Sequence, residues 1–226
     1  MKDIVIKRGV DSVDQPDLLG LIIKTTDIEL GSTHTGFILL KQNQELSIAH
    51  LCAQSYRFEA YKDSYIYTWI DELDESITVP LMARLKNLSI NGKINVEYSP
   101  VYSGNGTLDD TACKYIPDPD VPSDGLTCAT FVILMLESFG IHIIDRTSWK
   151  ITQEDTIWFE RMLKDHFFLF PPHFFETLQN DKGKYPRFRP EQVVAAGGIY
   201  EDDPISFDQA NIASQKVLQQ LLLHQC

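Results

Sequence analysis

The residues "TCATFVILMLESFG" place a cysteine, Cys128, at the mouth of an apolar run that is typical of a core helix ending at Gly140. Thr127 or Asp124 can cap this helix, which places the thiol in its first turn. The free backbone N–H groups and the positive end of the helix dipole stabilise a thiolate there, and the thiolate is the attacking form of cysteine. A small buried core cysteine is the alternative interpretation.

Two histidines stand on neighbouring predicted strands. His34 begins "HTGFILLK" and His50 lies within "LSIAHLCA", and the residues "KQNQE" (Lys41–Glu45) between them are typical of a hairpin turn. Antiparallel pairing can bring the two imidazoles together, but the register is left open by the sequence. A reactive cysteine needs a histidine to take its proton, and that histidine needs an orienting partner. Cys128, His34 and His50 are therefore a candidate set, and hydrogen-bonded strand histidines are the alternative.

The secondary-structure elements that must position these residues are predicted to be strands in the first part of the chain and mostly helices after it. Closely spaced β-branched and aromatic segments predict an antiparallel meander of four strands: Gly20–Thr26, His34–Lys41, Leu46–Ala53 and Ser55–Tyr61. Helical patterns follow at Trp69–Asn91, Cys128–Phe139, Thr152–Phe167, "PPHFFETLQND" and the C-terminal "SFDQANIASQKVLQQLLLHQC", with a long loop at Tyr98–Gly125. Strands first and helices later, without βαβ alternation, predict an α+β fold. We expect a core at 1–150 and a helical extension at 151–226, packed together as one compact domain.

The segments "THTGFILL…IAHL" and "TCATFVILMLESFGI" resemble the histidine strands and the nucleophile helix of the NlpC/P60 papain-like superfamily. The histidines precede the cysteine, as in the circularly permuted branch that contains the YiiX-like and lecithin:retinol acyltransferase-like proteins. The resemblance covers about residues 20–62 and 124–144. Thr127 stands where the family usually has Asp or Asn, and Ala129 follows the cysteine where the family has Ser or Glu. The resemblance implies a permuted papain-like sheet packed on the nucleophile helix.

The same resemblance implies that Cys128 is the nucleophile, His34 the general base and His50 the orienting residue. The corresponding chemistry is acyl transfer through a thioester. The backbone N–H of Cys128 is a candidate oxyanion donor. The second donor is not identified, and Tyr98 and Tyr102 are guesses for it.

Other residue patterns carry weaker signals. In "YPRFRPEQV", Arg187 and Arg189 are candidates for clamping a substrate carboxylate, with a structural salt bridge as the alternative. No metal site is expected, because Pro171 and Pro172 break any shared helix between His166 and His173. No cofactor is expected, since the chain has no GxGxxG or Walker sequence. The remaining cysteines lack a helix-mouth position and are expected to be inert: Cys52, Cys113 and Cys226.

The amino-acid composition limits the classes of binding partner that we expect for this chain. The formal net charge of −12, from 32 acidic and 20 basic residues, disfavours nucleic acid and anionic membranes. The N-terminal sequence has no signal-peptide pattern, and no stretch of about 18 apolar residues predicts membrane insertion. We expect reduced cysteines and a cytoplasmic location, or export by a signal-less secretion system with a protein partner.

Three functions from different classes remain open. The first is a cysteine hydrolase that cleaves an amide bond of a peptide, for example a cell-wall peptide. The second is an acyltransferase or lipid-ester hydrolase of the lecithin:retinol acyltransferase-like type, against which the acidic charge and the lack of an apolar anchor both stand. The third is a catalytically silent binding module that keeps the fold.

Overall fold

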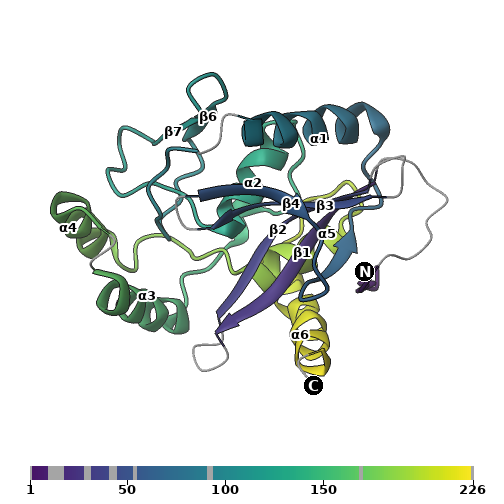
Figure 1. Ribbon diagram of the computed structural model, residues 1–226. Helices are drawn as coiled ribbons and strands as arrows, with labels where there is room; N and C mark the ends of the chain where they lie inside the picture. The colour runs from purple at the N-terminus through teal and green to yellow at the C-terminus, as the bar shows by residue number, and fades with distance from the viewer. Residues whose placement is uncertain are drawn as a thin grey trace.

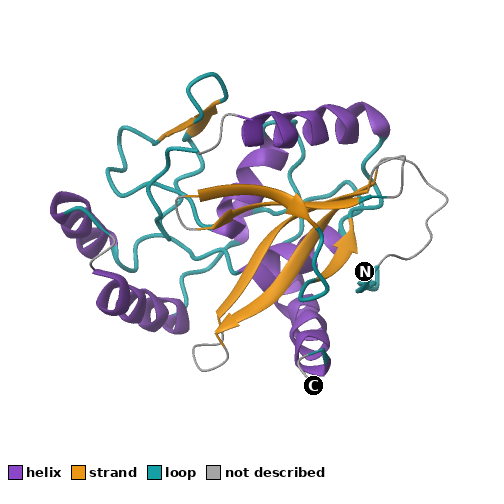
Figure 2. Cartoon of the chain, viewed as in Figure 1, coloured by secondary structure: helices purple, strands orange, loops and turns teal. Residues whose placement is uncertain are grey.

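The computed structural model describes residues 2–9, 18–27, 32–40, 45–52, 55–90, 94–167 and 170–224. Its main sheet is antiparallel, with strand order β4-β3-β2-β1-β5, and a two-stranded sheet pairs β6 with β7 (Figure 1). The strands are β1 (Leu18–Asp27), β2 (Ser32–Leu40), β3 (Leu46–Cys52), β4 (Ser55–Ala60), β5 (Ile66–Trp69), β6 (Thr107–Asp109) and β7 (Lys114–Ile116). The α-helices are α1 (Glu75–Ile90), α2 (Cys128–Glu137), α3 (Gln153–His166), α4 (Pro172–Asp181), α5 (Pro190–Ile199) and α6 (Phe207–Leu223), and a 3-10 turn spans Arg146–Ser148. The predicted α+β class is confirmed (Figure 2).

The predicted meander is confirmed as β1 to β4, with boundaries that differ by one or two residues. The prediction missed β5, which pairs with β1 at the other edge of the sheet. It also started the next helix too early, because α1 begins at Glu75, and Pro80 lies inside this helix. The long loop predicted at Tyr98–Gly125 contains β6 and β7. Most of the predicted turn, at 41–44, lies outside the described residues.

The two faces of the main sheet carry different apolar layers. Side chains alternate along each strand, so Leu21 and Phe37 face the helices while Ile22 and Ile38 face the opposite side. Helices α1, α2 and α5 pack on the first face, and α6 packs on α5. The opposite face is covered by a smaller aromatic cluster that includes Tyr65, Tyr67 and Trp69. His34, His50 and Cys52 fall on this second face by the same alternation.

Residues before and after position 150 both contribute side chains to the apolar core. Val193 and Val194 of α5 and Val217 of α6 are fully buried in the main core beneath the sheet. Helices α3 and α4 instead form a second cluster, in which Phe159 and Leu178 pack near Val101 and Val121. This second cluster places α3 opposite the start of α2, where the cavity described below is found (Figure 1).

One glycine controls how closely β2 and β3 approach. A Cβ atom at Gly36 would lie 2.4 Å from the Cβ of His50 and 2.6 Å from the carbonyl oxygen of Ala49. Real Cβ atoms do not come this close to such atoms, and the backbone oxygen cannot swing away. The absence of a side chain at Gly36 therefore lets His50 lie against β2, close to His34.

We predict that Gly36→Ala lowers the free energy of unfolding by about 1–3 kcal/mol, because it overpacks the β2–β3 contact. Urea denaturation measures the loss. Gly140→Asn is the matched control, since nothing lies within 4 Å of an added Cβ there and Asn tolerates its φ of 76°. Equal stability of Gly36→Ala and the wild type would show that the close approach is not needed.

Candidate active site

Helix α2 begins with Cys128, and the preceding residue caps it. The Thr127 hydroxyl accepts from the Thr130 backbone N–H at 3.2 Å, and the Thr130 hydroxyl accepts from the Thr127 backbone N–H at 2.8 Å. Of the two caps that the sequence allowed, the structure uses Thr127. Asp124 instead accepts hydrogen bonds from the Tyr115 hydroxyl and the Asp118 backbone N–H. The predicted position of the thiol in the first helical turn is thus confirmed.

Cys128 meets the sheet where the β2–β3 ladder ends. The β2–β3 ladder runs from the Leu40–Leu46 pair to the Phe37–Ala49 pair. Beyond this point the strands are no longer paired, and the thiol lies against the freed part of β2, where the Thr35 backbone N–H donates to the sulfur. Cys128, the first residue of α2, and His34 both line the cavity described next, although the His34 side chain starts from the far face of the sheet.

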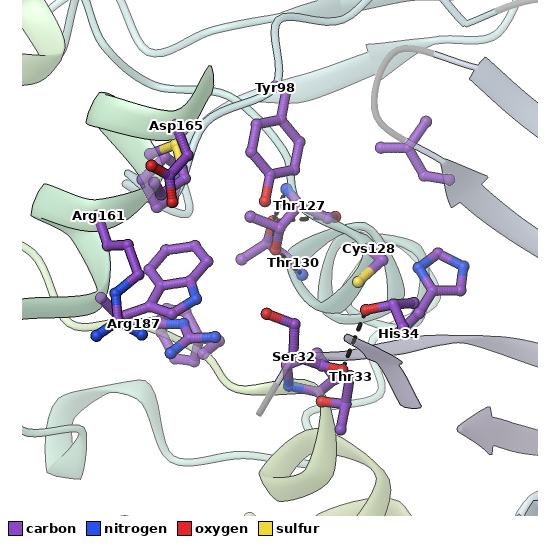
Figure 3. A pocket seen from close by; sticks show the side chains of 17 residues that line it. Ser32, Thr33, His34, Tyr98, Thr127, Cys128, Thr130, Arg161, Asp165 and Arg187 are labelled. Carbon is purple, nitrogen blue, oxygen red and sulfur yellow. Dashed lines mark hydrogen bonds between the residues drawn. The ribbon is translucent and has the colours of Figure 1, made fainter. Parts of the chain in front are cut away.

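Cys128 and His34 line one cavity of about 340 Å³. Figure 3 shows them beside each other at one end, with Arg161, Asp165 and Arg187 at the other. Between these ends Figure 3 shows the hydroxyl-bearing side chains of Ser32, Thr33, Tyr98, Thr127 and Thr130. The cavity is also lined by the apolar side chains of Leu51, Trp158, Met162 and Phe188. The sulfur and the imidazole of these two described residues share this wall without a hydrogen bond between them. The sulfur is held by the backbone N–H groups of Thr35 and Ala129.

A hydrogen-bond chain leads away from the cavity through the two histidines. His34 Nε2 lies 2.8 Å from His50 Nδ1, and His50 Nε2 lies 3.2 Å from Glu59 Oε1. A carboxylate can only accept, so the proton of neutral His50 is on Nε2 and its Nδ1 carries a lone pair. His34 Nε2 then donates to that lone pair, which leaves His34 Nδ1 unprotonated. The arrangement makes Nδ1 of His34 a proton acceptor.

Burial dominates the protonation of the nucleophile candidate. Removal from water raises the pKa of the Cys128 thiol to about 11, and the hydrogen bonds from the Thr35 and Ala129 backbone lower it by less. The helix start therefore does not yield a resting thiolate, which corrects the expectation from the sequence. The backbone contacts are the predicted kind, but desolvation outweighs them.

The same physical effect acts on the base candidate. Burial, and then the neighbouring His50, Lys24 and Arg57, lower the pKa of His34 to about 3. Burial also lowers the pKa of His50, against the opposing effect of the hydrogen bond that His50 donates to Glu59. Cys128 and His34 are consequently both neutral at pH 7. A thiolate–imidazolium pair is not the resting state of this site.

Two residues that the sequence analysis did not assign to the site belong to it. Glu59 on β4 is the diagonal cross-strand neighbour of His50, because Glu59 pairs with Ile48 and Arg57 pairs with His50. Cys52, expected to be inert, directs its sulfur to 3.2 Å from His50 Nδ1 and 3.8 Å from His34 Nε2. The signal for Cys52 was its i+2 spacing from His50, which puts both on one face of a strand. Cys113 is buried elsewhere, and Cys226 lies outside the described residues.

The structure separates the two candidate arginines. Arg187 lines the cavity, and its guanidinium lies over the Trp158 ring, 3.6 Å from the ring centroid. Arg189 donates to Asp155 at 2.8 Å and to Glu154 at 3.0 Å, so it is bound to the start of α3. It is not among the residues that line the cavity, and its contacts are those of the structural salt bridge that was the alternative.

The two tyrosines guessed as oxyanion donors also differ. Tyr98 lines the cavity, and burial raises its pKa to about 12, so its hydroxyl keeps its proton and can donate. Figure 3 shows that hydroxyl directed toward Thr127. Tyr102 is buried against Phe188 and lies 3.4 Å from a Glu137 carboxylate oxygen, outside the cavity wall. Tyr98 is therefore the better candidate for the second donor.

Comparison with known proteins finds no match to this chain among protein-family models, curated proteins or solved structures. In the part of the chain that the structure describes, no helix combines the length and apolar character needed to cross a bilayer.

We predict that alkylation of Cys128 by iodoacetamide is slow at pH 7 and accelerates about tenfold per pH unit up to about pH 10, because only the thiolate reacts. Mass spectrometry of proteolytic peptides follows the labelling of each cysteine separately, and Cys128→Ser identifies the peptide that must lose its label. Rapid labelling of Cys128 below pH 6, ahead of the other cysteines, would show a thiolate at rest and contradict the assigned protonation.

Proposed function

We propose that this chain is a cysteine hydrolase that cleaves an amide bond of a peptide through a thioester on Cys128. The observation that supports this proposal is the hydrogen-bond chain Glu59–His50–His34. It leaves Nδ1 of His34 unprotonated, and the His34 imidazole lines the same cavity as the Cys128 thiol. The papain-like resemblance of the histidine strands and the cysteine helix agrees with this assignment of roles.

In the first step, Cys128 Sγ attacks the carbonyl carbon of the substrate while its proton moves to His34 Nδ1. Because thiol and imidazole are both neutral at rest, the two events take place together in this proposal. The imidazolium is stabilised through His50 by Glu59, whose pKa is lowered by its hydrogen bonds to Lys62 and His50. The carbonyl oxygen that gains negative charge accepts from the Cys128 backbone N–H and the Tyr98 hydroxyl.

In the second step, the tetrahedral intermediate collapses and His34 gives its proton to the leaving amine. The acyl group stays on sulfur as a thioester. A water molecule then attacks this thioester, gives a proton to His34 Nδ1, and releases the acid and the Cys128 thiol. Each proton taken by His34 is returned within the same half-reaction.

The substrate that the cavity binds distinguishes two candidate functions, an amide hydrolase and a lipid acyltransferase or ester hydrolase. The hydroxyl groups of Ser32, Thr127 and Tyr98 suit the polar backbone of a peptide, which favours hydrolysis of an amide. The apolar wall formed by Trp158, Met162 and Phe188 suits an acyl chain, which favours the second candidate, an acyltransferase or lipid-ester hydrolase. Both candidates use the same thioester.

We predict that Cys128→Ala and His34→Ala abolish turnover without unfolding the protein. His50→Ala should retain residual activity, because an orienting residue contributes less than the base itself. A base contributes about 10²–10⁴-fold to rate, so the His34 variant should fall by at least this factor. Peptides that include cell-wall peptides, and phospholipid vesicles, are incubated with each variant, and products are detected by mass spectrometry.

The thioester gives an independent readout. Acid-quenched wild-type protein should carry the acyl mass, hydroxylamine should remove it, and Cys128→Ala should never acquire it. Circular dichroism checks that each variant is folded. Full turnover by His34→Ala would refute the base assignment, and turnover by Cys128→Ala would refute the nucleophile.

We predict that Arg187→Met raises KM about 10–100-fold for a substrate with a carboxylate, with little change in kcat. The loss corresponds to one charge-assisted hydrogen bond at the end of the cavity away from Cys128. The matched control is the same substrate with its carboxylate converted to an amide, whose KM should not respond to the substitution. An equal rise in KM for both substrates would mean that Arg187 supports the cavity wall and does not bind the substrate carboxylate.

A further inference from the structure

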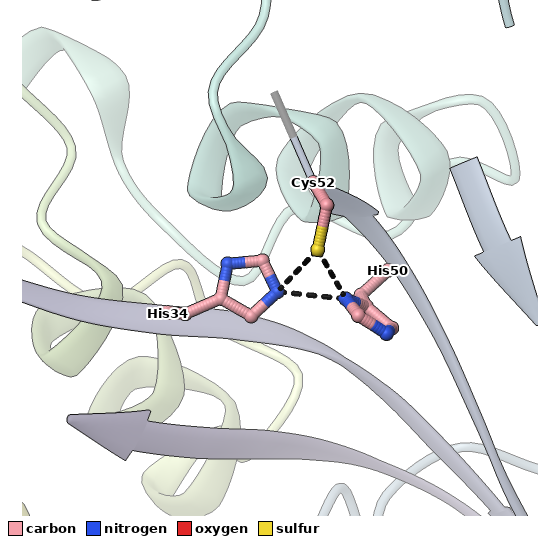
Figure 4. A group of neighbouring side chains, drawn as sticks. All are labelled: His34, His50 and Cys52. Carbon is pink, nitrogen blue, oxygen red and sulfur yellow. Dashed lines mark hydrogen bonds between the residues drawn. The ribbon is translucent and has the colours of Figure 1, made fainter. Parts of the chain in front are cut away.

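Two imidazole nitrogens and one thiol sulfur converge behind the cavity. His34 Nε2, His50 Nδ1 and Cys52 Sγ all lie within 4.8 Å of one another. Figure 4 shows the three side chains directed at a common point from β2 and β3. The separations are 2.8 Å between the two nitrogens, 3.2 Å from the sulfur to His50 and 3.8 Å from the sulfur to His34.

Two of the three groups lie within hydrogen-bond distance of the same acceptor. His50 Nε2 gives its proton to Glu59, so His50 Nδ1 has one lone pair. The His34 Nε2–H and the Cys52 S–H both lie within hydrogen-bond distance of that lone pair, and one lone pair accepts one strong hydrogen bond. A cation would instead bind the three atoms as acceptors.

We propose that His34, His50 and Cys52 form a binding site for Zn²⁺ or a similar divalent transition metal. Zn²⁺ prefers nitrogen and thiolate ligands at about 2.0–2.1 Å and 2.3 Å, which in a tetrahedron places the ligand atoms about 3.3–3.6 Å apart. The separations in the structure differ from these by about half an ångström or less. Cys52 loses its proton to solvent on binding, and the proton on His34 Nε2 is replaced by one on Nδ1.

The residues around the three ligands fit this use. Glu59 holds the ring nitrogen of His50 that faces away from the ligands, an arrangement that orients histidine ligands in zinc sites. Lys24 and Arg57 act electrostatically on both histidines and oppose a cation. The negative charges of the Cys52 thiolate and Glu59 offset them.

The metal would switch the catalytic site off, and this part rests on the proposed function. Metal on His34 Nε2 moves the imidazole proton to Nδ1, the nitrogen that must accept the proton of Cys128. It also breaks the hydrogen bond from His34 to His50. The cavity wall includes His34 but neither His50 nor Cys52, so the metal lies behind the imidazole, away from the substrate. The site is thus a reversible inhibitory one.

Cobalt substitution tests binding without any substrate. Titration of chelator-treated protein with Co²⁺ should saturate at one equivalent, with a thiolate-to-cobalt charge-transfer band and the visible bands of tetrahedral Co²⁺, and Zn²⁺ should displace it. Cys52→Ser should lose the charge-transfer band, whereas Cys128→Ser should keep it. Glu59→Gln should weaken binding about 10–100-fold. Circular dichroism checks the fold of each variant.

Absence of the tetrahedral spectrum in the wild type overturns the site, as does a charge-transfer band that survives in Cys52→Ser. In the turnover assay, Zn²⁺ should inhibit, a chelator should restore activity, and Cys52→Ser should need at least tenfold more Zn²⁺ for half inhibition. Zn²⁺ that binds without inhibiting overturns the inhibitory role. A cobalt spectrum without turnover of any substrate would keep the metal site and reject the proposed hydrolase, so the two failures are distinct.

Discussion

The Glu59 carboxylate accepts a hydrogen bond from His50 Nε2, and this contact sets the proton on each ring nitrogen between it and the cavity. A carboxylate cannot donate, so His50 must present a lone pair to His34, and His34 must present its own lone pair at Nδ1. The two proposed activities draw on this same set of lone pairs. A proton on Nε2 of His34 prepares Nδ1 to accept the thiol proton, whereas a metal on Nε2 prevents it.

Burial of these groups favours their neutral forms. Burial raises the pKa of Cys128 to about 11 and lowers the pKa of His34 to about 3, because it disfavours the charged form of each group. We therefore expect slow reaction of this thiol with general electrophiles at rest. In the proposed mechanism, charge separation develops only with a carbonyl in place, where the backbone N–H of Cys128 and the Tyr98 hydroxyl meet the growing negative charge.

The cavity is assembled from parts of the chain that pack separately. The main core holds β2, β3 and α2, which carry the histidines and the thiol. The second cluster holds α3, which supplies Trp158, Arg161 and Asp165 to the far wall. Arg187 joins the two, since it lies over Trp158 and precedes α5 in the main core. The proposed nucleophile and base are therefore carried by elements of the main core, whereas Trp158, Arg161 and Asp165 come from a helix of the second cluster.

The sequence by itself determined the α+β class, the meander of β1 to β4, the start of α2 at Cys128 and the pairing of two histidine strands, because hydrophobic alternation, capping and helical periodicity are local. It missed β5 and the β6–β7 hairpin, whose strands of three or four residues are too short for a clear pattern. Only the tertiary structure decided that Glu59 and Cys52 reach the histidines. It also decided that Arg187 faces the cavity, whereas Arg189 binds Asp155 and Glu154. The neutral form of the Cys128 thiol likewise follows from its burial in the folded chain. The physical reason is that register, desolvation and cross-strand distance depend on residues far apart in the chain, and no local pattern records them.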